Sequence, residues 1–242
     1  MEVRVNGAPF AVIMRTPGAD RELAAGFLLA EDVIHDANEL GTIEYCEDAE
    51  VEARQNTLNV TVIGDAVPRL AARLGERRQV MMTASCGLCG RRTIESLRSR
   101  VEEVAGNWSI ATSLVRALPP ALRRAQDVFE TTGGLHGAGL FGLDGVLQVI
   151  AEDVGRHNAV DKVIGRRLLE DALPLDRSIL VVSGRTSFEL VQKALLAGIP
   201  MVAAVSAPSS LAIELAVASN VTLCGFVRGD SFNIYAHPER VV

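Results

Sequence analysis

The sequence predicts an α/β fold in which a three-layer α/β/α domain, residues 81–242, follows a small α+β domain, residues 1–80. In the second half, predicted strands and helices alternate, which is typical of a parallel sheet with helices on its faces. The segments "ILVV" and "MVAAV" are apolar at every position, as strands covered on both faces are. In the first half, "TLNVTV" alternates apolar and polar positions, as a strand with one exposed face does.

Composition is that of a globular protein. Hydrophobic residues make up 48% and charged residues 22% of the 242 positions, so the chain can bury a core. No apolar run approaches the roughly 18 residues of a membrane span, and the first ten residues lack a signal-peptide pattern. A net charge of −6 argues against nucleic acid or a membrane as partner. Four cysteines do not form a disulfide framework in so long a chain, so we expect reduced thiols and a cytoplasmic protein.

The N-terminal elements follow from local patterns. "EVRV" predicts a short strand, and residues 16–34 predict a turn, a cap at Asp20 and a helix. Residues 50–64 predict a hairpin that turns at Gln55-Asn56. A short helix, "VPRLAARLGERR", and a strand, "QVMMTA", are expected next.

The C-terminal elements alternate regularly. Residues 137–153 predict a hairpin around Leu143-Asp144-Gly145. Helices are expected over 157–172, 186–198 and 209–220, with buried strands at 178–184, 200–207 and 221–226. Thr186 and Glu189 have the spacing of a capping box for the second of these helices. The turns "SGRTS", "SAPSS" and "GFVRGDS" should lie at the carboxyl ends of the strands, where sites gather in such sheets.

The segment "TASCGLCGRR", residues 83–92, places Cys86 and Cys89 among glycines. A closed zinc site needs two more ligands, and Cys46 and Cys224 stand alone. Deaminase-type zinc needs an H-x-E before P-C-x-x-C, but a serine precedes Cys86 and the only H-x-E, residues 237–239, follows it. The motif therefore gives little support to zinc.

Three other readings of the cysteine pair remain: a dithiol redox pair, two core cysteines, and a nucleophilic thiol. We favour the last, because the glycines leave room for a large partner at the sulfur. A helix that begins near Arg91-Arg92 would direct amide dipoles and two cations at the thiol and so favour the thiolate. An accessible thiolate can accept a sulfane sulfur and hold it as a persulfide.

Three further stretches could bind a ligand, although ordinary turns and caps would also explain them. "TTGGLHGAGLF", residues 131–141, surrounds His136 with glycines that allow close backbone approach. "SGRTSFELVQKA" offers Ser183, Arg185 and Thr186 at a helix start suited to phosphate. "AEDVGRHNAVDK" collects hydrogen-bonding side chains at the end of a strand, namely Glu152, Asp153, Arg156, His157, Asn158, Asp161 and Lys162.

Together these segments resemble the FdhD family of formate dehydrogenase accessory sulfurtransferases. The resemblance runs nearly end to end, through "VNG", "TPGADRELAAGFLLAE", "SCGLCG", "TGGLHGAGLF", "EDVGRHNAVDKVIG", "SGRTSFELVQKALLAGIP", "SAPSSLAIELA" and "GFVRGDSFNIY". One departure is "AEDVI", residues 30–34, where the family reads Glu-Gly-Ile-Ile. Asp32 in place of that glycine is expected to alter a helix end without touching the chemistry.

The resemblance implies a sulfur carrier with a fold similar to cytidine deaminase. Such a carrier takes sulfur from a cysteine desulfurase as a persulfide on Cys86, with Cys89 as its neighbour. It then passes the sulfur to the molybdenum (or tungsten) bis-guanine-dinucleotide cofactor, which goes to formate dehydrogenase. The family also implies a homodimer, and we expect no stoichiometric zinc. The alternative is a cofactor-binding chaperone in which the cysteines are dispensable.

The same resemblance points to "GFVRGDS", residues 225–231, as the segment that binds the guanine dinucleotide. Phe226 can stack on a purine, Arg228 can meet a phosphate, and the Gly229 backbone allows close approach. Asp230 can accept two hydrogen bonds from guanine, which adenine cannot donate. Val227 and Ser231 complete the segment, and His136 with the "SGRTS" turn should line the same crevice.

Overall fold

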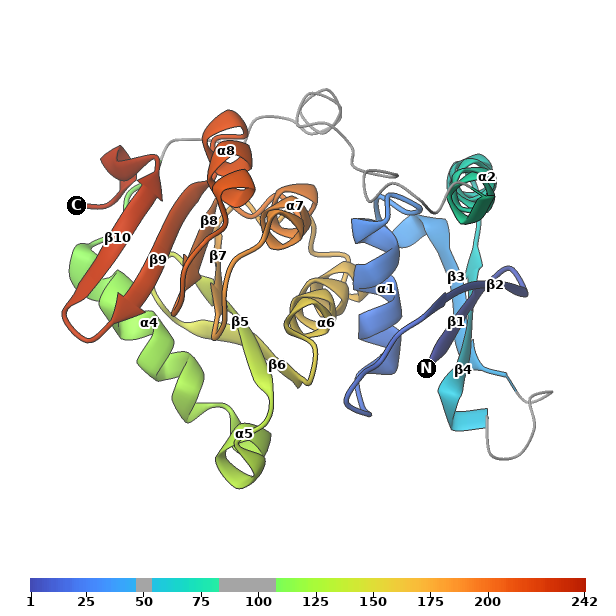
Figure 1. The fold of residues 1–242 in the computed structure, drawn as a ribbon, viewed down its shortest axis with the longest axis horizontal. Helices are drawn as coiled ribbons and strands as arrows, with labels where there is room; N and C mark the ends of the chain where they lie inside the picture. The colour runs from blue at the N-terminus through green and yellow to red at the C-terminus, as the bar shows by residue number, and fades with distance from the viewer. Residues whose placement is uncertain (47–53, 83–107) are drawn as a thin grey trace.

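Two β-sheets organise the chain in the computed structural model, which describes residues 1–46, 54–82 and 108–242 (Figure 1). The smaller sheet has the strand order β2-β1-β4-β3 and the larger one β10-β9-β8-β7-β5-β6. The strands of the smaller sheet are β1 (Glu2–Val5), β2 (Ala8–Val12), β3 (Leu40–Tyr45) and β4 (Thr57–Val62). Those of the larger sheet are β5 (His136–Gly142), β6 (Leu147–Asp153), β7 (Ser178–Val182), β8 (Met201–Ala204), β9 (Thr222–Arg228) and β10 (Ser231–Ala236).

Helices lie on both faces of the larger sheet (Figure 1). One face carries α6 (Arg156–Leu169), α7 (Phe188–Leu196) and α8 (Ser210–Ala218), and the other carries α4 (Thr112–Arg124). The short α5 (Asp127–Thr132) links α4 to β5. In the N-terminal part, α1 (Asp20–Ala30) lies between the smaller sheet and α6, and α2 (Ala66–Met82) follows β4. Single 3-10 turns occupy Ala37–Glu39, Arg54–Asn56 and Pro238–Arg240.

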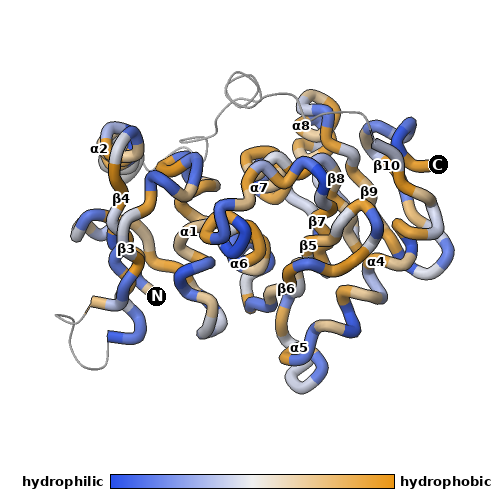
Figure 2. The backbone as a smooth tube through the Cα atoms, turned by 180° about the vertical axis from the view of Figure 1, so that it is seen from behind, coloured by the Kyte–Doolittle hydropathy of each residue, from blue (hydrophilic) through white to orange (hydrophobic). Residues whose placement is uncertain are grey.

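The centre of the larger sheet is apolar on both faces. Every residue of β7 and β8 is buried, and β7, β8 and β9 pair in parallel. Figure 2 shows these strands as largely hydrophobic, with hydrophilic stretches in the loops around them. The α/β class and the hairpin of β5 and β6 are confirmed. The division of the chain at residue 80 stays a prediction, and one buried cluster contains residues from both sides of it, such as Val3, Leu28 and Leu180.

Two glycines let α1 and α6 touch backbone to backbone. A Cβ atom added to Gly165 would lie 1.9 Å from the carbonyl oxygen of Glu22, and one added to Gly26 would lie 2.0 Å from that of Asp161. Neither position can hold a side chain without moving a helix. This contact ties the N-terminal part of the chain to the larger sheet's helical layer.

Two predicted N-terminal features are wrong. Asp20 is the first residue of α1, and the N-cap is Ala19, so the Asp20 carboxylate instead accepts hydrogen bonds from Arg15 and the Tyr45 hydroxyl. Residues 50–53 of the expected hairpin lie outside the described residues, but β4 pairs antiparallel with β3, and Arg54–Asn56 form a 3-10 helix where the tight hairpin turn was expected. Gln55-Asn56 lacks the glycine that a two-residue hairpin turn favours.

The strand predicted at residues 79–84 is also wrong over residues 79–82, which are helical. Helix α2 continues to Met82, and residues 83 and 84 lie outside the described residues. Glutamine, methionine and arginine are strong helix formers, so the helix meets no breaker between Gly75 and that point.

Asp32 stands where the chain requires a left-handed backbone. Its φ is 60°, two residues after α1 ends, which explains why a glycine is favoured at this position. The aspartate is held there by Arg73 of α2, at 2.8 Å, and by the His35 ring, at 3.0 Å. The substitution therefore adds an ion pair between α2 and the end of α1.

Candidate functional site

The carboxyl ends of β7, β8 and β9 meet at one edge of the larger sheet, as their parallel pairing requires. The three turns that follow these strands are joined by hydrogen bonds into a continuous rim. The Thr186 amide donates to the Ala207 carbonyl at 3.1 Å, and the Phe226 amide donates to the Ser206 carbonyl at 3.2 Å. The expectation that these segments share one edge is confirmed for "SGRTS" and "SAPSS", whereas Gly225 to Arg228 of "GFVRGDS" extend β9 at that edge.

The segment 225–231 is a β-hairpin. Gly225 to Arg228 continue β9, Gly229 and Asp230 make the turn, and Ser231 begins β10, so the expected loop is shorter than predicted. Phe226 is 40% exposed and has a φ of 54°, a strained conformation for an aromatic residue. Such strain is common where a side chain is held for a ligand.

Side chains of this hairpin alternate in direction. Phe226 and Arg228 are exposed, whereas Val227 is buried against α4, so only the Val227 backbone could meet a ligand. The Arg228 Nε donates to the Val205 carbonyl at 2.7 Å, which anchors the guanidinium on the rim. Asp230 and Ser231 are exposed at the tip.

His136 lies beside the turn after β7. A Cβ atom added to Gly184 would lie 3.3 Å from the His136 Nδ1, so the glycine lets the His136 ring approach the backbone of this turn. The Ser183 hydroxyl accepts a hydrogen bond from the Gly137 amide at 2.9 Å, and Arg185 is exposed. The structure thus brings His136 to the "SGRTS" turn, as expected.

Thr186 does not cap α7, which corrects the predicted capping box. The N-cap is Ser187, because the Thr186 backbone is held extended in a bridge to Pro208. The Thr186 side chain is only 1% exposed, and its hydroxyl has no hydrogen-bond partner among the described residues.

Arg156, His157 and Ser187 join this edge. Ser187 belongs to the predicted "SGRTS" turn, and Arg156 and His157 belong to the polar stretch 151–162, although none of the three was singled out as a cofactor-binding residue. The His157 Nε2 and the Ser187 hydroxyl are 3.0 Å apart. Burial, together with the nearby cations Arg156 and Lys193, lowers the pKa of His157 to about 4. The signal in the sequence was the polar stretch 151–162, but spacing alone could not separate its members.

The other polar residues of that stretch are structural. Asp153 and Lys162 form a buried ion pair at 2.7 Å, and both bind the backbone of Thr16. Asn158 donates to the Met14 carbonyl, and Glu152 accepts from two amides at the start of α5. Asp161 pairs with Lys193 at 2.5 Å, and burial raises the pKa of Asp161 to about 6.

Cys86 and Cys89 lie outside the described residues. Of the other two thiols, Cys224 is buried in β9, and burial raises its pKa to about 12. Over residues 1–46, 54–82 and 108–242, no group of three or more His, Cys, Asp or Glu side chains could hold a metal ion. In the same ranges, no helix is long and apolar enough to cross a membrane.

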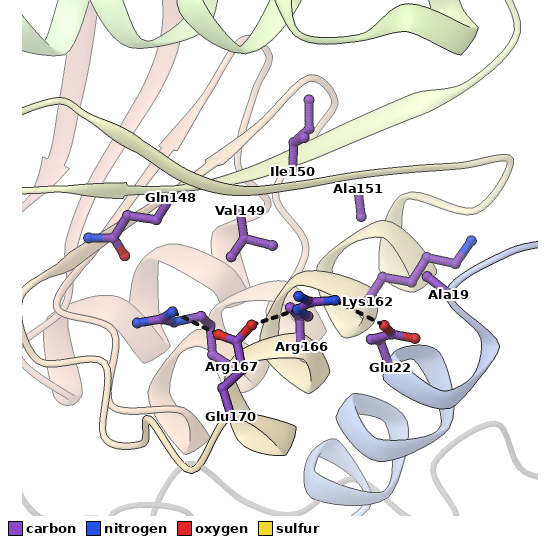
Figure 3. A pocket seen from close by; sticks show the side chains of 10 residues that line it. All are labelled: Ala19, Glu22, Gln148, Val149, Ile150, Ala151, Lys162, Arg166, Arg167 and Glu170. Atoms are coloured by element: carbon purple, nitrogen blue, oxygen red, sulfur yellow. Dashed lines mark hydrogen bonds and ion pairs between the residues drawn. The ribbon is translucent and has the colours of Figure 1, made fainter.

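A pocket of about 280 Å³ opens between α1, α6 and the edge strand β6 (Figure 3). Its charged side chains neutralise one another: Arg166 pairs with Glu170 at 2.6 Å and with Glu22 at 3.6 Å, and Arg167 pairs with Glu170 at 2.8 Å. Lys162 is the one candidate residue from the stretch 151–162 among the described residues that line this pocket, and none of the predicted cofactor-binding residues does so.

Comparison with known proteins matches the whole chain, residues 1–242, to the FdhD/NarQ family. The chain belongs to this family. It is 49% identical to the sulfur carrier protein FdhD of Streptomyces avermitilis, over all of this chain and 86% of that protein. It is 48% identical to the protein of the same name from Mycobacterium tuberculosis, over all of this chain and 89% of that one.

The FdhD/NarQ fold is also seen in a crystal structure of a formate dehydrogenase accessory protein from Desulfotalea psychrophila. That structure matches with a TM-score of 0.77 and 27% identity, over all of this chain and 88% of the other. The family resemblance drawn from the sequence motifs is therefore confirmed. The roles of individual residues in this FdhD/NarQ chain stay predictions.

Proposed function

We propose that this FdhD/NarQ protein is a sulfur carrier that serves formate dehydrogenase. It takes sulfur from a cysteine desulfurase as a persulfide on Cys86 and transfers it to the molybdenum bis-guanine-dinucleotide cofactor before that cofactor is inserted. The observation that carries the proposal is the match along the entire chain, at 48–49% identity, to proteins named as sulfur carriers. The protein works in the cytoplasm as a homodimer, with the desulfurase and the formate dehydrogenase catalytic subunit as partners.

Sulfur moves by exchange between thiolates. The Cys86 thiolate attacks the terminal sulfur of the desulfurase persulfide, a new S–S bond forms, and the desulfurase cysteine leaves as a thiolate. Cys224 is a poor alternative, because a buried thiol with a pKa of about 12 is protonated at neutral pH. Cys89 can relay or protect the sulfur, so it is the less important member of the pair.

The cofactor is a substrate here, and the rim offers the groups that it needs. Phe226 is exposed for stacking, Arg228 presents a guanidinium, and Asp230 is exposed at the hairpin tip, where it can accept hydrogen bonds from guanine. His136 and the turn with Ser183, Arg185 and Thr186 continue the rim toward β5. The Val227, Gly229 and Ser231 backbones complete the hairpin surface.

Intact mass after incubation with a desulfurase and cysteine tests the carrier role. The protein should gain the mass of one sulfur, located on Cys86. Cys86→Ala should abolish the gain and the activation of formate dehydrogenase while the circular dichroism spectrum is unchanged, and Cys89→Ala should cost less. Cys46→Ala is the matched control and should behave as wild type. Full formate dehydrogenase activity in cells that carry only Cys86→Ala would instead support a chaperone with dispensable cysteines.

Calorimetric titration with GDP tests whether the hairpin 225–231 binds the guanine dinucleotide. Asp230→Asn removes the double acceptor and should weaken GDP binding by about 1.5–3 kcal/mol per charged hydrogen bond lost. ADP should be unaffected, because adenine cannot donate these two hydrogen bonds. Unchanged GDP affinity in both Asp230→Asn and Arg228→Ala would place the cofactor away from the hairpin.

A further inference from the structure

β5 and β7 are antiparallel neighbours, so the amino end of β5 and the carboxyl end of β7 lie at the same edge of the larger sheet. The chain enters β5 from α4 and α5 on one face, and it leaves β7 for α7 on the other face (Figure 1). In open α/β sheets, ligands bind outside the carboxyl ends of the parallel strands, of which β7 is one. His136, Arg156, His157 and Ser187 meet at this place, some strands away from the Phe226 hairpin.

Gly184 lies close to two members of this cluster. A Cβ atom at residue 184 would lie 3.3 Å from the His136 Nδ1 and 3.8 Å from the Arg156 Cδ. His157 approaches from the first turn of α6, with its Nε2 at 3.0 Å from the Ser187 hydroxyl. His136 and Arg156 therefore both lie within 4 Å of the Cβ position of Gly184, and His157, which follows Arg156 in the chain, links them to Ser187.

The hydrogen bonding of Arg156 is incomplete. Its Nε is buried without a partner, and its guanidinium makes no ion pair with any described residue. The Nε of Arg167 in the same helix is also buried without a partner among the described residues, but Arg166 and Arg167 both pair with Glu170, so the difference at Arg156 is that it forms no ion pair with a described residue. A buried donor without a partner is costly and is rare in native proteins unless a ligand or water completes it.

The groups around Arg156 favour an oxygen anion. The Arg156 guanidinium carries only donors, and the His136 ring lies near it at Gly184, whereas the Ser187 hydroxyl is already hydrogen-bonded to His157 and to the Glu189 carboxylate. Lys193 adds positive potential, although Asp161 neutralises much of it at 2.5 Å. The Glu189 carboxylate is a negative group near the cluster, and it interacts electrostatically with both His157 and Arg156. Planar guanidinium groups match phosphate oxygens in paired hydrogen bonds.

We propose that His136, Arg156, His157 and Ser187 form a binding site for a phosphoryl group, centred on the Arg156 guanidinium. The site rests on the proposed function only in that a dinucleotide substrate supplies such groups. It is separate from the base-reading hairpin and does not involve the cysteines. Arg156 binds the anion directly, and His157 positions the Ser187 hydroxyl toward it.

Calorimetric titration of the full chain with inorganic pyrophosphate tests this site. Arg156→Gln should weaken binding about 10- to 100-fold, as the loss of a charged hydrogen bond does. Arg156→Lys keeps the positive charge but not the paired hydrogen-bond geometry, so its pyrophosphate affinity should lie between those of the wild type and of Arg156→Gln. Arg166→Gln, the same change farther along α6, is the control and should bind within twofold of wild type. Glu189→Gln removes a repelling charge and should bind a few-fold more tightly.

The outcomes separate this site from the carrier role. Repeating the titration in Cys86→Ala should give wild-type pyrophosphate affinity even though sulfur transfer is lost, so each proposal can fail alone. Thermal unfolding of Arg156→Gln checks that the variant is folded, and the Arg156→Lys result decides the matter if it is not. Absence of pyrophosphate binding by the wild type, equal affinity in Arg156→Gln, or an equal loss in Arg166→Gln would overturn the site.

Discussion

Gly165→Ala should separate α1 from α6. The new Cβ would lie 1.9 Å from the Glu22 carbonyl oxygen, 2.7 Å from the Gly26 nitrogen and 2.8 Å from the Glu22 carbonyl carbon. Ordinary contact begins near 3.4 Å, so the two helices must move apart by about 1.5 Å. All three obstructing atoms belong to the backbone, and no side-chain rotation relieves them.

The expected loss of stability follows from two opposing effects. Overpacking in a close-packed region costs about 1–3 kcal/mol and occasionally more. Replacing glycine by alanine within a helix stabilises the helix by about 1 kcal/mol. Because the obstruction is backbone against backbone, the cost should lie at the upper end, which leaves a net loss of about 2 kcal/mol. For a chain of this size that corresponds to a fall in Tm of about 4–8 °C.

Thermal unfolding followed by circular dichroism measures the effect, with Gly75→Ala as the matched control. Gly75 also lies within a helix, α2, but an added Cβ there meets no atom of the described residues within 4 Å. That variant should be as stable as wild type or more so, by up to about 1 kcal/mol. If Gly165→Ala unfolds at or above the wild-type temperature, the close α1–α6 contact is not what joins the two parts of the chain.

Three further predictions concern titration, thiol reactivity and metal content. The His157 imidazole should titrate near pH 4 when followed by NMR. Because a histidine in the unfolded chain titrates near 6.5, the unfolded state binds more protons between these values, and the protein becomes less stable as the pH falls from 6.5 to 4. A titration midpoint above pH 6 would contradict the burial of His157 beside Arg156. Cys224 should resist iodoacetamide at pH 8 until the protein is unfolded, since its pKa is about 12, and rapid labelling of the native protein would show that β9 opens. Elemental analysis should find no stoichiometric zinc, whereas one zinc per chain that is lost in Cys86→Ala would revive a metal site at the cysteine pair.

Local chemistry in the sequence was enough to place many elements. The strands β7 and β8 could be read because each is apolar at every position, a pattern that only burial on both faces explains. Parallel strands place their carboxyl ends together, so the row of turns "SGRTS", "SAPSS" and "GFVRGDS" followed from topology alone. The family motifs carried the functional expectation, which the match along the whole chain supports at the level of family.

Sequence patterns misled where a residue's partner is distant in the chain. Thr186 has the spacing of a cap, but the bridge to Pro208, over twenty residues on, holds it extended and shifts the helix start to Phe188. Asp32 looked like a disturbance at a helix end, yet Arg73, some forty residues later, supplies its ion pair.

The sequence by itself determined the class of fold, the edge of the sheet that carries the candidate site and the family. Tertiary structure alone decided which polar residues of the stretch 151–162 belong to that edge. Asp153 and Lys162 form a buried ion pair with each other, whereas Arg156 and His157 lie beside the turn after β7. Residues at neighbouring positions in α6 point in directions set by the helical repeat. Their roles therefore depend on which other element packs against each face, and the order of residues does not contain that information.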